Sequence, residues 1–328
     1  MKIIEVQDAL KLDAVFVDTR TPKEYEEATI PNAINIPLFS NEERAVVGTI
    51  YTKVGKNEAI EKGMEFVSGH LPNILNEFNK YKDRKIVVFC WRGGMRSKSI
   101  VSLLDSLGFD VYQLNGGHKA FRRYVLERLE TYKFNFRLIV LHGLTGSGKT
   151  EILKKFKNSI DLEDLAQHRN SMLGGVGLKP RSQKMFDALL LKKLDELKNE
   201  KYVLIEGESR RLGNLNLPNL LFSEMKKGIN VKIDSPIDDR VKRIVKEYGN
   251  HKVEIKEILP RFKRLMSKKD FNMINEFLCN GELEEAALIL LKDYYDKKYG
   301  HSINNLKYNF YIKDNYINNL KKFIAGLA

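Results

Sequence analysis

Residues 136–156 read FRLIVLHGLTGSGKTEILKKF: an apolar run, a glycine-rich loop and a stretch of helical composition. The β-branched run predicts a buried strand. The loop GLTGSGKT, from Gly143 to Thr150, fits the pattern of Gly, any four residues, Gly, Lys and then Ser or Thr. That pattern indicates phosphate binding when a strand precedes it and a helix follows, as here. The stretch therefore predicts an α/β domain built around a phosphate-binding loop (P-loop).

The residue types in this loop suit a phosphorylated ligand. Glycine amides can wrap a phosphate, Lys149 can reach an outer phosphate, and the Thr150 hydroxyl can hold Mg²⁺. A metal also needs a carboxylate, and Glu206, at the end of the predicted strand YVLIE, and Glu208 are the candidates for a metal-binding or catalytic role, although Asp is more usual there. No metal ligand is certain from the sequence. The candidate phosphate-binding residues are Gly143, Gly146, Ser147, Gly148, Lys149 and Thr150.

A second strand–loop–helix stretch lies at residues 87–97, VVFCWRGGMRS. Cys90 would stand at the carboxyl end of a buried strand, where open α/β sheets place ligands. The two glycines permit a tight loop, the helix start adds partial positive charge, and arginines add full charges. These features favour a thiolate over a thiol and predict a nucleophilic, catalytic Cys90. The predicted anion cradle around it consists of Arg92, Gly93, Gly94, Met95, Arg96 and Ser97.

Strand-like runs alternate with helical patterns on both sides of a soft boundary near residues 130–137. This alternation predicts α/β folds with parallel sheets. We expect one domain over residues 1–132 and a second over 136–328, whose C-terminal part from about 239 to 328 is helical and basic.

Positive charge is concentrated in the second half of the chain. Residues 1–135 carry a net charge of +2, whereas residues 136–328 carry +11. Residues 239–269 hold 11 Lys and Arg against 4 Asp and Glu, and the segment KDYYDKKYG interleaves tyrosine with lysine, which suits stacking on unpaired bases. A solvated helix face is the alternative. The candidate RNA or phosphate contacts are Arg210, Arg211, Arg240, Lys242, Arg243, Arg261, Lys263 and Arg264.

Composition excludes several other classes of protein. The chain has no run of about 18 apolar residues and no signal-peptide core at its start, so we expect neither a membrane span nor a membrane partner. Its two cysteines, Cys90 and Cys279, lie far apart and lack zinc-site spacing. A cytoplasmic location is the expectation, and Cys279 is expected in a helical core.

The segment DTRTPKEYEEATIPNAINIP, the Cys90 loop and LNGGHKAF together resemble a rhodanese domain over about residues 10–125. The second half adds the P-loop, DLEDLAQHRNSMLG at 161–174 and EGESRRLGNLNLP at 206–218. A rhodanese domain followed by such a P-loop domain is similar to the tRNA 2-selenouridine synthases. The resemblance implies a rhodanese-like parallel-sheet domain over residues 1–132, a P-loop α/β domain and a helical C-terminal extension.

The resemblance also implies an activity. Members of this family replace the sulfur of 2-thiouridine at the tRNA wobble position with selenium from selenophosphate, and they S-geranylate that nucleoside with geranyl diphosphate as an intermediate step. Cys90 would be the reactive rhodanese cysteine. The P-loop would hold the diphosphate of the geranyl donor, with ATP or GTP as the alternative ligand. No tightly bound cofactor is expected, Mg²⁺ is a candidate ion, and a selenophosphate-supplying enzyme is a candidate partner.

Two departures from the rhodanese pattern keep other functions open. Arg96 lies six residues after Cys90 instead of five, as in cysteine-dependent phosphatases, and His118 stands where a rhodanese often has Trp. A phosphatase would need an aspartate acid near Cys90, and Asp18 is the obvious candidate. A third possibility is a non-enzymatic RNA-binding or nucleotide-sensing protein in which both loops are simple anion sites.

Overall fold

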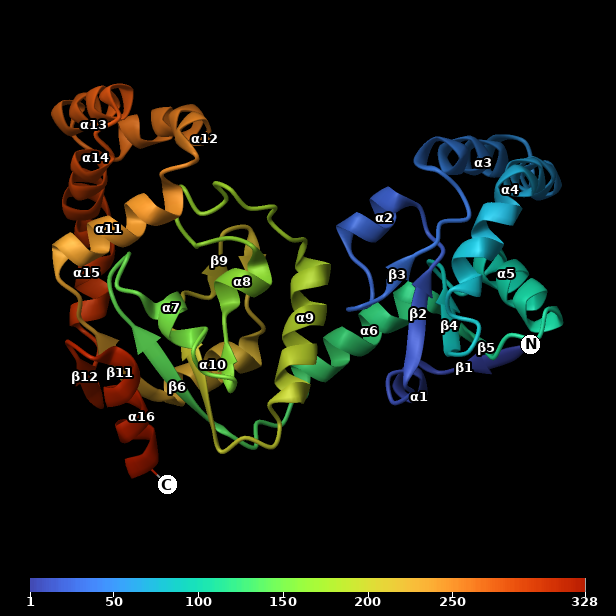
Figure 1. Ribbon diagram of the computed structural model, residues 1–328, viewed down its shortest axis with the longest axis horizontal. Helices are drawn as coiled ribbons and strands as arrows, with labels where there is room; N and C mark the ends of the chain where they lie inside the picture. The colour runs from blue at the N-terminus through green and yellow to red at the C-terminus, as the bar shows by residue number, and fades with distance from the viewer. Residues whose placement is uncertain (328) are drawn as a thin grey trace. The chain divides into compact units, whose positions relative to one another are not determined.

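The computed structural model describes residues 1–327, and it divides into two compact units (Figure 1). The first unit comprises Met1–Leu129 together with Ser182–Lys192, and the second comprises Glu130–Arg181 together with Lys193–Ala328. The grouping of residues 182–192 with the N-terminal unit was not predicted from the sequence.

The first unit is built on a five-stranded parallel sheet in the order β1-β5-β4-β2-β3. Its buried strands are the β-branched and aromatic runs of the sequence, and Val17, Ile86 and Val88 are fully buried among them. The strands are β1 (Lys2–Ile4), β2 (Ala14–Asp18), β3 (Ile34–Asn35), β4 (Lys85–Phe89) and β5 (Val111–Leu114). Because β4 lies at the centre, the Cys90 loop that follows it opens at the middle of the sheet edge.

Helices connect these strands. Thr21 caps α2 with its side chain and forms a reciprocal capping box with Glu24, and Pro22 occupies the first turn. The helix α3 was not predicted, since its apolar positions make no clear stripe and none of its residues is buried. The helices are α1 (Val6–Ala9), α2 (Pro22–Glu27), α3 (Asn41–Lys53), α4 (Lys56–Asn79), α5 (Met95–Ser106) and α6 (Gly117–Glu130).

The second unit holds another five-stranded parallel sheet, in the order β12-β11-β6-β8-β7. The central strand β6 leads into the P-loop, with β8 on one side and β11 on the other. Such a switch point leaves a crevice beyond the carboxyl ends of the strands. The strands are β6 (Arg137–His142), β7 (Ser159–Ile160), β8 (Tyr202–Glu206), β11 (Ile229–Ile233) and β12 (Phe310–Ile312), with a separate antiparallel pair, β9 (Arg211–Leu212) and β10 (Leu215–Asn216).

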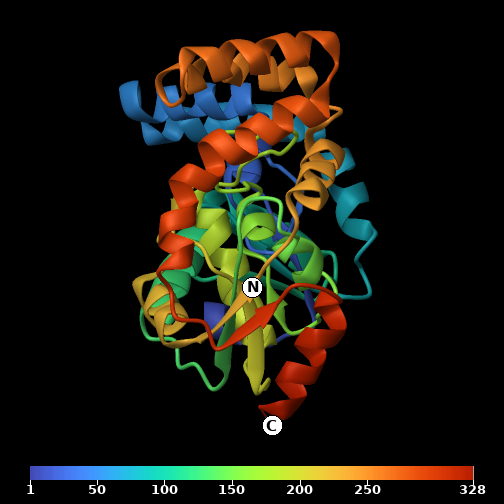
Figure 2. The ribbon, with the colours of Figure 1, turned by 90° about the vertical axis from the view of Figure 1, so that its left-hand side faces the viewer.

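The C-terminal region begins as a helical bundle. In Figure 2 the run from α14 through α15 continues as one long orange-to-red helix, which includes a π-helical stretch. The helices of this unit are α7 (Lys149–Leu153), α8 (Leu162–Ala166), α10 (Asn219–Lys227), α11 (Ile237–Tyr248), α12 (Lys252–Ile258), the 3-10 helix η1 (Leu259–Arg264), α13 (Lys268–Asn280), α14 (Leu283–Ile289), the π-helix η2 (Leu290–Tyr295), α15 (Asp296–Asn304) and α16 (Tyr316–Gly326). The helix α9 (Gln183–Glu196) groups with the first unit up to Lys192.

The final segment differs from the expected all-helical end. Strand β12 returns to the sheet and pairs with β11, and α16 packs its buried Leu320 on the same core as Ile152 and Val231. A three-residue strand at an edge has too little sequence pattern to be predicted, and its formation depends on the distant partner strand.

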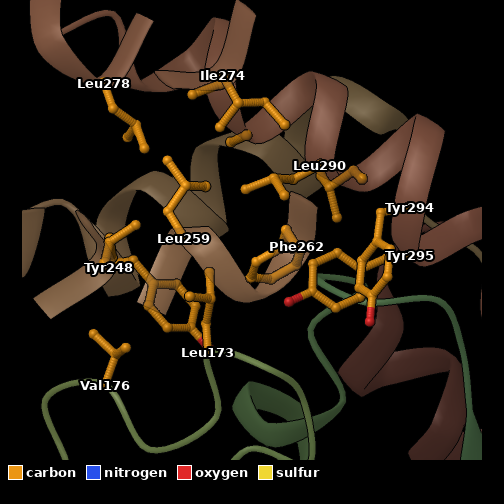
Figure 3. Close-up of a cluster of buried hydrophobic side chains, with 14 of the residues drawn as sticks. Leu173, Val176, Tyr248, Leu259, Phe262, Ile274, Leu278, Leu290, Tyr294 and Tyr295 are labelled. Carbon is orange, nitrogen blue, oxygen red and sulfur yellow. The ribbon is translucent and has the colours of Figure 1, made fainter. Parts of the chain in front are cut away.

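The bundle encloses a separate apolar core that also fixes a loop. Figure 3 shows Leu173 and Val176, from the loop between α8 and α9, placed with Tyr248 and Phe262 of the bundle. All four side chains are buried. This packing ties the loop at residues 168–176 to the bundle and so determines where its polar residues lie.

Candidate functional site: two loops at the ends of central strands

Cys90 is buried directly after β4. Its Sγ lies 3.2 Å from the Ser97 hydroxyl, and Gln113 donates hydrogen bonds to Ser97 Oγ at 3.1 Å and to the Gly93 carbonyl at 2.7 Å. Gly117 has a φ of +57°, and a side chain there would collide with the Cys90 carbonyl. Ser97, in the first turn of α5, is therefore the neighbour of the sulfur, and Gln113 of β5 holds its hydroxyl in place.

The loop around Cys90 has the character of an anion site. Among the described residues, the amides from Trp91 to Arg96 donate no backbone hydrogen bond outside regular secondary structure, and the first-turn amides of α5 have no partners within the helix. Arg92 and Met95 are exposed. Arg96 forms an ion pair with Glu24 at 2.9 Å. Arg92 is thus the arginine that is free to meet an anion, whereas Arg96 must first release Glu24.

Two polar side chains beside this loop, Asp18 and His118, are buried and packed against neighbouring groups of the fold. Asp18 is fully buried and accepts hydrogen bonds from the Arg20 guanidinium, the Arg20 amide and the Thr29 hydroxyl. It is therefore not a free acid for the Cys90 sulfur, which removes the candidate acid of the phosphatase alternative. His118 stacks on Trp91, and burial, with a contribution from Arg20, lowers the pKa of His118 to about 3.

The P-loop has the predicted setting, with β6 before it and α7 after it. Gly148 caps α7 with a φ of +91°, a conformation that other residues rarely adopt. Lys149 Nζ donates to the Gly143 carbonyl at 2.9 Å, across the mouth of the loop. The buried Ser147 hydroxyl has no hydrogen-bond partner within residues 1–327. The loop therefore presents a lysine, a threonine and an unsatisfied hydroxyl to one small volume.

The carboxylate next to the P-loop is one that the sequence did not single out. Thr150 Oγ1 donates to Glu163 Oε2 at 3.4 Å, and Glu163 and Glu208 both line the adjoining cavity. Glu206 is instead completely buried, where one of its oxygens accepts the Glu163 amide at 2.7 Å. Of the two predicted candidate carboxylates, Glu208 lines the cavity and Glu206 does not. The segment DLEDLAQ supplies Glu163, but its spacing gave no reason to prefer this carboxylate over its neighbours.

The pKa values of Glu163 and Glu206 are both raised. Burial, together with the nearby Glu208 and Asp161, raises the pKa of Glu163 to about 8. Burial and the neighbouring Glu163 raise the pKa of Glu206 well above its usual range. A Glu163 that is mostly protonated at pH 7 does not repel a phosphate on the P-loop.

Within the described chain, no group of three or more His, Cys, Asp or Glu side chains is arranged to hold a metal ion. Thr150 and Glu163 together offer a partial set of oxygen ligands. Mg²⁺ commonly takes one or two protein ligands and completes its shell with substrate phosphates and water. The residues therefore fit Mg²⁺ only in the company of a phosphorylated ligand.

A cavity of about 740 Å³ opens from the P-loop within the second unit. It lies within the range of roughly 300–1,000 Å³ that is typical of small-molecule sites. Its walls differ in chemistry. One wall is polar and includes Lys149, Thr150 and Glu163, whereas another is formed by Val140, Phe222, Met225, Ile303 and Leu306.

The loop at 168–176 supplies further cavity residues that the sequence did not identify as functional. Arg169 pairs with Glu247 and lies over the Tyr248 ring at 4.9 Å, and Asn170 donates to Glu208. Because Leu173 and Val176 anchor this loop in the bundle core, the bundle holds one rim of the cavity (Figure 3).

The predicted RNA or phosphate contacts separate into three groups. Arg240 is buried and forms a two-pronged ion pair with Asp296 while donating to the Thr145 carbonyl, so it supports the P-loop and cannot belong to an RNA-binding surface. Arg243 lines the cavity and donates to the Gly146 carbonyl at 3.1 Å. The others are exposed: Arg210, Arg211, Lys242, Arg261, Lys263 and Arg264. Cys279 is also exposed, not a core residue as expected.

The described residues include no helix with both the length and the apolar character needed to cross a bilayer.

Comparison with known proteins assigns a family to each half of the chain. Residues 3–124 match the family described as the rhodanese-like domain, and residues 136–272 match the tRNA 2-selenouridine synthase AAA domain. The predicted fold class, a rhodanese-like domain followed by a P-loop-like domain and a helical C-terminal region, is confirmed.

Relatives that match nearly three quarters of the chain carry the name of this second family. The protein named tRNA 2-selenouridine synthase from Shewanella piezotolerans is 33% identical over 251 residues, which cover 74% of this chain and 68% of that protein. The one from Nitrosomonas europaea is 33% identical over 247 residues, covering 72% of this chain and 64% of the relative, so the match spans just under two thirds of that protein. The crystal structure of the N-terminal domain of a protein from Clostridium difficile 630 is 54% identical, with a TM-score of 0.37, and covers 38% of this chain and 99% of its own.

Proposed function

The chain belongs to the tRNA 2-selenouridine synthase family, and from that premise we propose that it converts 2-thiouridine at the tRNA wobble position to 2-selenouridine. Selenophosphate supplies the selenium, and an S-geranylated nucleoside, formed with geranyl diphosphate, is the intermediate. One observation carries the proposal. The same chain has a loop suited to an anion around Cys90, after β4, and a P-loop that lines a cavity, after β6.

We assign the geranyl step to the P-loop. The sulfur of the nucleoside attacks the first carbon of the geranyl group, and the bond from that carbon to the diphosphate oxygen breaks. The developing charge on the diphosphate needs cationic and N–H partners, which Lys149 and the glycine amides provide. Thr150 and Glu163 would hold Mg²⁺, which would supply charge stabilisation for the departing diphosphate. ATP or GTP is the alternative occupant.

We assign the selenium step to the Cys90 loop. Once geranylated, the sulfur is part of a good leaving group. The selenium of selenophosphate bonds to the same carbon of the base, geranyl thiolate leaves, and water cleaves the selenium–phosphorus bond to release phosphate. Selenophosphate is a small tetrahedral anion, and the unpaired amides and Arg92 beside Cys90 suit such a group. Cys90 is the reactive residue of this step, with Ser97 next to its sulfur.

We place the tRNA on the basic part of the helical bundle. Arg261, Lys263 and Arg264 are all exposed on η1, and Lys268 and Lys269 follow at the start of α13. Five cations in nine residues, with no carboxylate among them, form a strongly attractive patch for a phosphate backbone. The buried Arg240 is not part of this surface.

Mass analysis of nucleosides tests the proposed function. Transfer RNA that contains 2-thiouridine is incubated with the pure protein and geranyl diphosphate, and selenophosphate is added later. We expect a geranylated nucleoside first and a selenium-containing one afterwards. An unchanged nucleoside, with folded protein that binds the tRNA, would overturn the proposal. A protein whose Cys90→Ala variant keeps its full biological activity would instead be a non-enzymatic binding protein.

A further inference from the structure

The cavity that the P-loop lines is also lined by residues of β6, of α10 and of the chain at the end of α15. Val140 and His142 lie two residues apart on β6, so both project to the same face. Phe222 and Met225 lie three residues apart on α10, so they share one helical face. Ile303 is in the last turn of α15, and Leu306 follows just after the helix, where its amide donates to the Ile303 carbonyl at 3.4 Å. We call the apolar side chains Val140, Phe222, Met225, Ile303 and Leu306 the alkyl groove.

The groove combines a buried base with an open rim. Val140 and Met225 are almost fully buried, whereas Leu306 is 41% exposed. Exposed leucine at the rim of a cavity gains free energy when an apolar ligand covers it. The groove therefore has exposed apolar surface that an apolar group of a ligand on the P-loop can cover.

Two polar side chains along the groove, His142 and Asn230, already have hydrogen-bond partners. His142 Nε2 and Asn230 Oδ1 lie 2.9 Å apart, and Asn230 Nδ2 donates to the Lys307 carbonyl. A nucleobase needs partners for the polar atoms on its edge, and these two side chains have little capacity left. An alkyl chain makes no such demand, and the Phe222 ring beside it is covered by Lys226, whose Nζ lies 4.7 Å from the ring centre.

A glycine makes room for the imidazole ring beside the groove. Gly207 follows β8, and a side chain at this position would collide with the His142 ring. Burial lowers the pKa of His142, which favours the neutral ring. A neutral ring next to the apolar side chains suits an alkyl ligand.

From this arrangement, and on the basis of the proposed function, we infer that the alkyl groove binds the hydrocarbon chain of the diphosphate substrate and that Phe222 and Leu306 set the chain length it accepts. The P-loop holds the diphosphate at one end, so the chain extends from a fixed point into a groove of limited length. The same geometry predicts that a nucleoside triphosphate binds through its phosphates alone.

Calorimetric titration of the full chain with geranyl diphosphate, inorganic diphosphate and ATP separates these contributions. We expect geranyl diphosphate to bind at least about 10-fold more tightly than inorganic diphosphate, since an alkyl chain is buried. Leu306→Asp should remove most of that difference and leave the affinity for inorganic diphosphate within 2-fold. Leu265→Asp, which alters an equally exposed leucine away from the cavity, is the matched control.

Chain-length selection gives an independent readout that does not depend on a charged substitution. Leu306→Trp should shorten the groove and shift preference from geranyl toward dimethylallyl diphosphate. Phe222→Ala should lengthen it and raise the relative affinity for farnesyl diphosphate. Unchanged preferences in both folded variants would overturn the groove assignment.

The outcomes distinguish the groove from the function it rests on. If the wild-type protein geranylates tRNA but Leu306→Asp has no effect on geranyl diphosphate binding, the groove is wrong and the function stands. If ATP binds more tightly than geranyl diphosphate and loses affinity in the groove variants, the groove holds a nucleotide, and both the chain assignment and the P-loop ligand are wrong.

Discussion

The Cys90 loop and the P-loop are built on the same plan and end in different chemistry. Each follows the central strand of a five-stranded parallel sheet and leads into a helix. The first surrounds a buried sulfur with a short anion cradle, whereas the second opens into a cavity of about 740 Å³ with an apolar wall. The loop at the carboxyl end of a central parallel strand thus suits an anion. The residues around the loop determine whether the site takes a small anion alone or a larger ligand that carries the anionic group.

The largest effect is expected when the Cys90 sulfur is removed, which tests whether the two loops perform different steps. Cys90→Ser should lower selenium transfer by at least about 1,000-fold, because the reactive atom of that step is lost. Geranylation should remain within 2-fold of wild type, since the tRNA sulfur is the nucleophile there. Nucleoside mass analysis measures both. Cys279→Ser is the matched control, because Cys279 is the exposed second cysteine and should affect neither step. A folded Cys90→Ser protein without geranylation would contradict the separation of roles.

The P-loop is tested by Lys149→Ala. Loss of this ammonium should lower geranylation by about 100-fold, since the departing diphosphate loses a charged partner. Calorimetry with geranyl diphosphate measures the accompanying loss of affinity. Lys154→Ala, which alters a lysine at the end of α7, is the control for a change of charge near the loop. Full activity in Lys149→Ala would remove the P-loop from the mechanism.

The bundle surface distinguishes the two units by charge. Replacing Arg261, Lys263 and Arg264 together with Gln should weaken tRNA binding by roughly 10-fold or more and reduce the slope of log K against log salt by about 2 to 3. Filter binding at several salt concentrations measures both quantities. Replacing the exposed Lys11, Lys53 and Lys56 of the first unit removes the same charge and should change little. Equal losses in both sets would indicate general charge attraction and no defined surface.

The smallest effect concerns pH, where the units should respond in opposite directions. The pKa of His118 falls from its ordinary value near 6.5 to about 3 in the fold, so the neutral ring stabilises the first unit above pH 6.5 and this contribution is lost as the pH falls. At pH 5 the loss is about 2 kcal/mol. Denaturation followed by fluorescence of Trp91, the one tryptophan in the sequence, reports on this unit. His118→Phe should reduce the loss of stability between pH 6.5 and pH 5. An equal loss in the variant and the wild type would contradict the assignment of this pH dependence to His118.

The second unit should respond at the other end of the scale. The pKa of Glu163 is raised to about 8 in the fold. The protonated side chain therefore contributes to the stability of the second unit below pH 4.5, and this contribution is lost as the pH rises toward 8. Hydrogen exchange of β6 and β8 between pH 5 and 9 measures it. Glu163→Gln should reduce the alkaline loss relative to wild type. A wild-type unit equally stable across this range would show that Glu163 ionises at its ordinary pKa.

Local sequence patterns were enough to predict the central strands and both loops. The runs before Cys90 and Gly143 are β-branched and bounded by glycine, and the Thr21–Pro22 cap marks its helix without reference to any other part of the chain. The motifs likewise identified Cys90 and Lys149. These features depend on residues within one turn or one strand of each other.

What the sequence did not predict depends on distant packing. Arg240 looked like a surface cation, but Asp296, 56 residues later, holds it in the interior. Glu206 ends a strand as expected, yet complete burial removes it from the cavity and leaves Glu163 beside Thr150. The alkyl groove is assembled from β6, α10 and α15, which no local pattern relates to one another.

The most direct test of the central claim supplies the intermediate. Transfer RNA already S-geranylated at the wobble position is incubated with selenophosphate and either Lys149→Ala or Cys90→Ser protein, and the nucleosides are analysed by mass. If the two loops perform different steps, Lys149→Ala will form 2-selenouridine at close to the wild-type rate and Cys90→Ser will form none. Equal failure of both folded variants on this substrate would contradict the account.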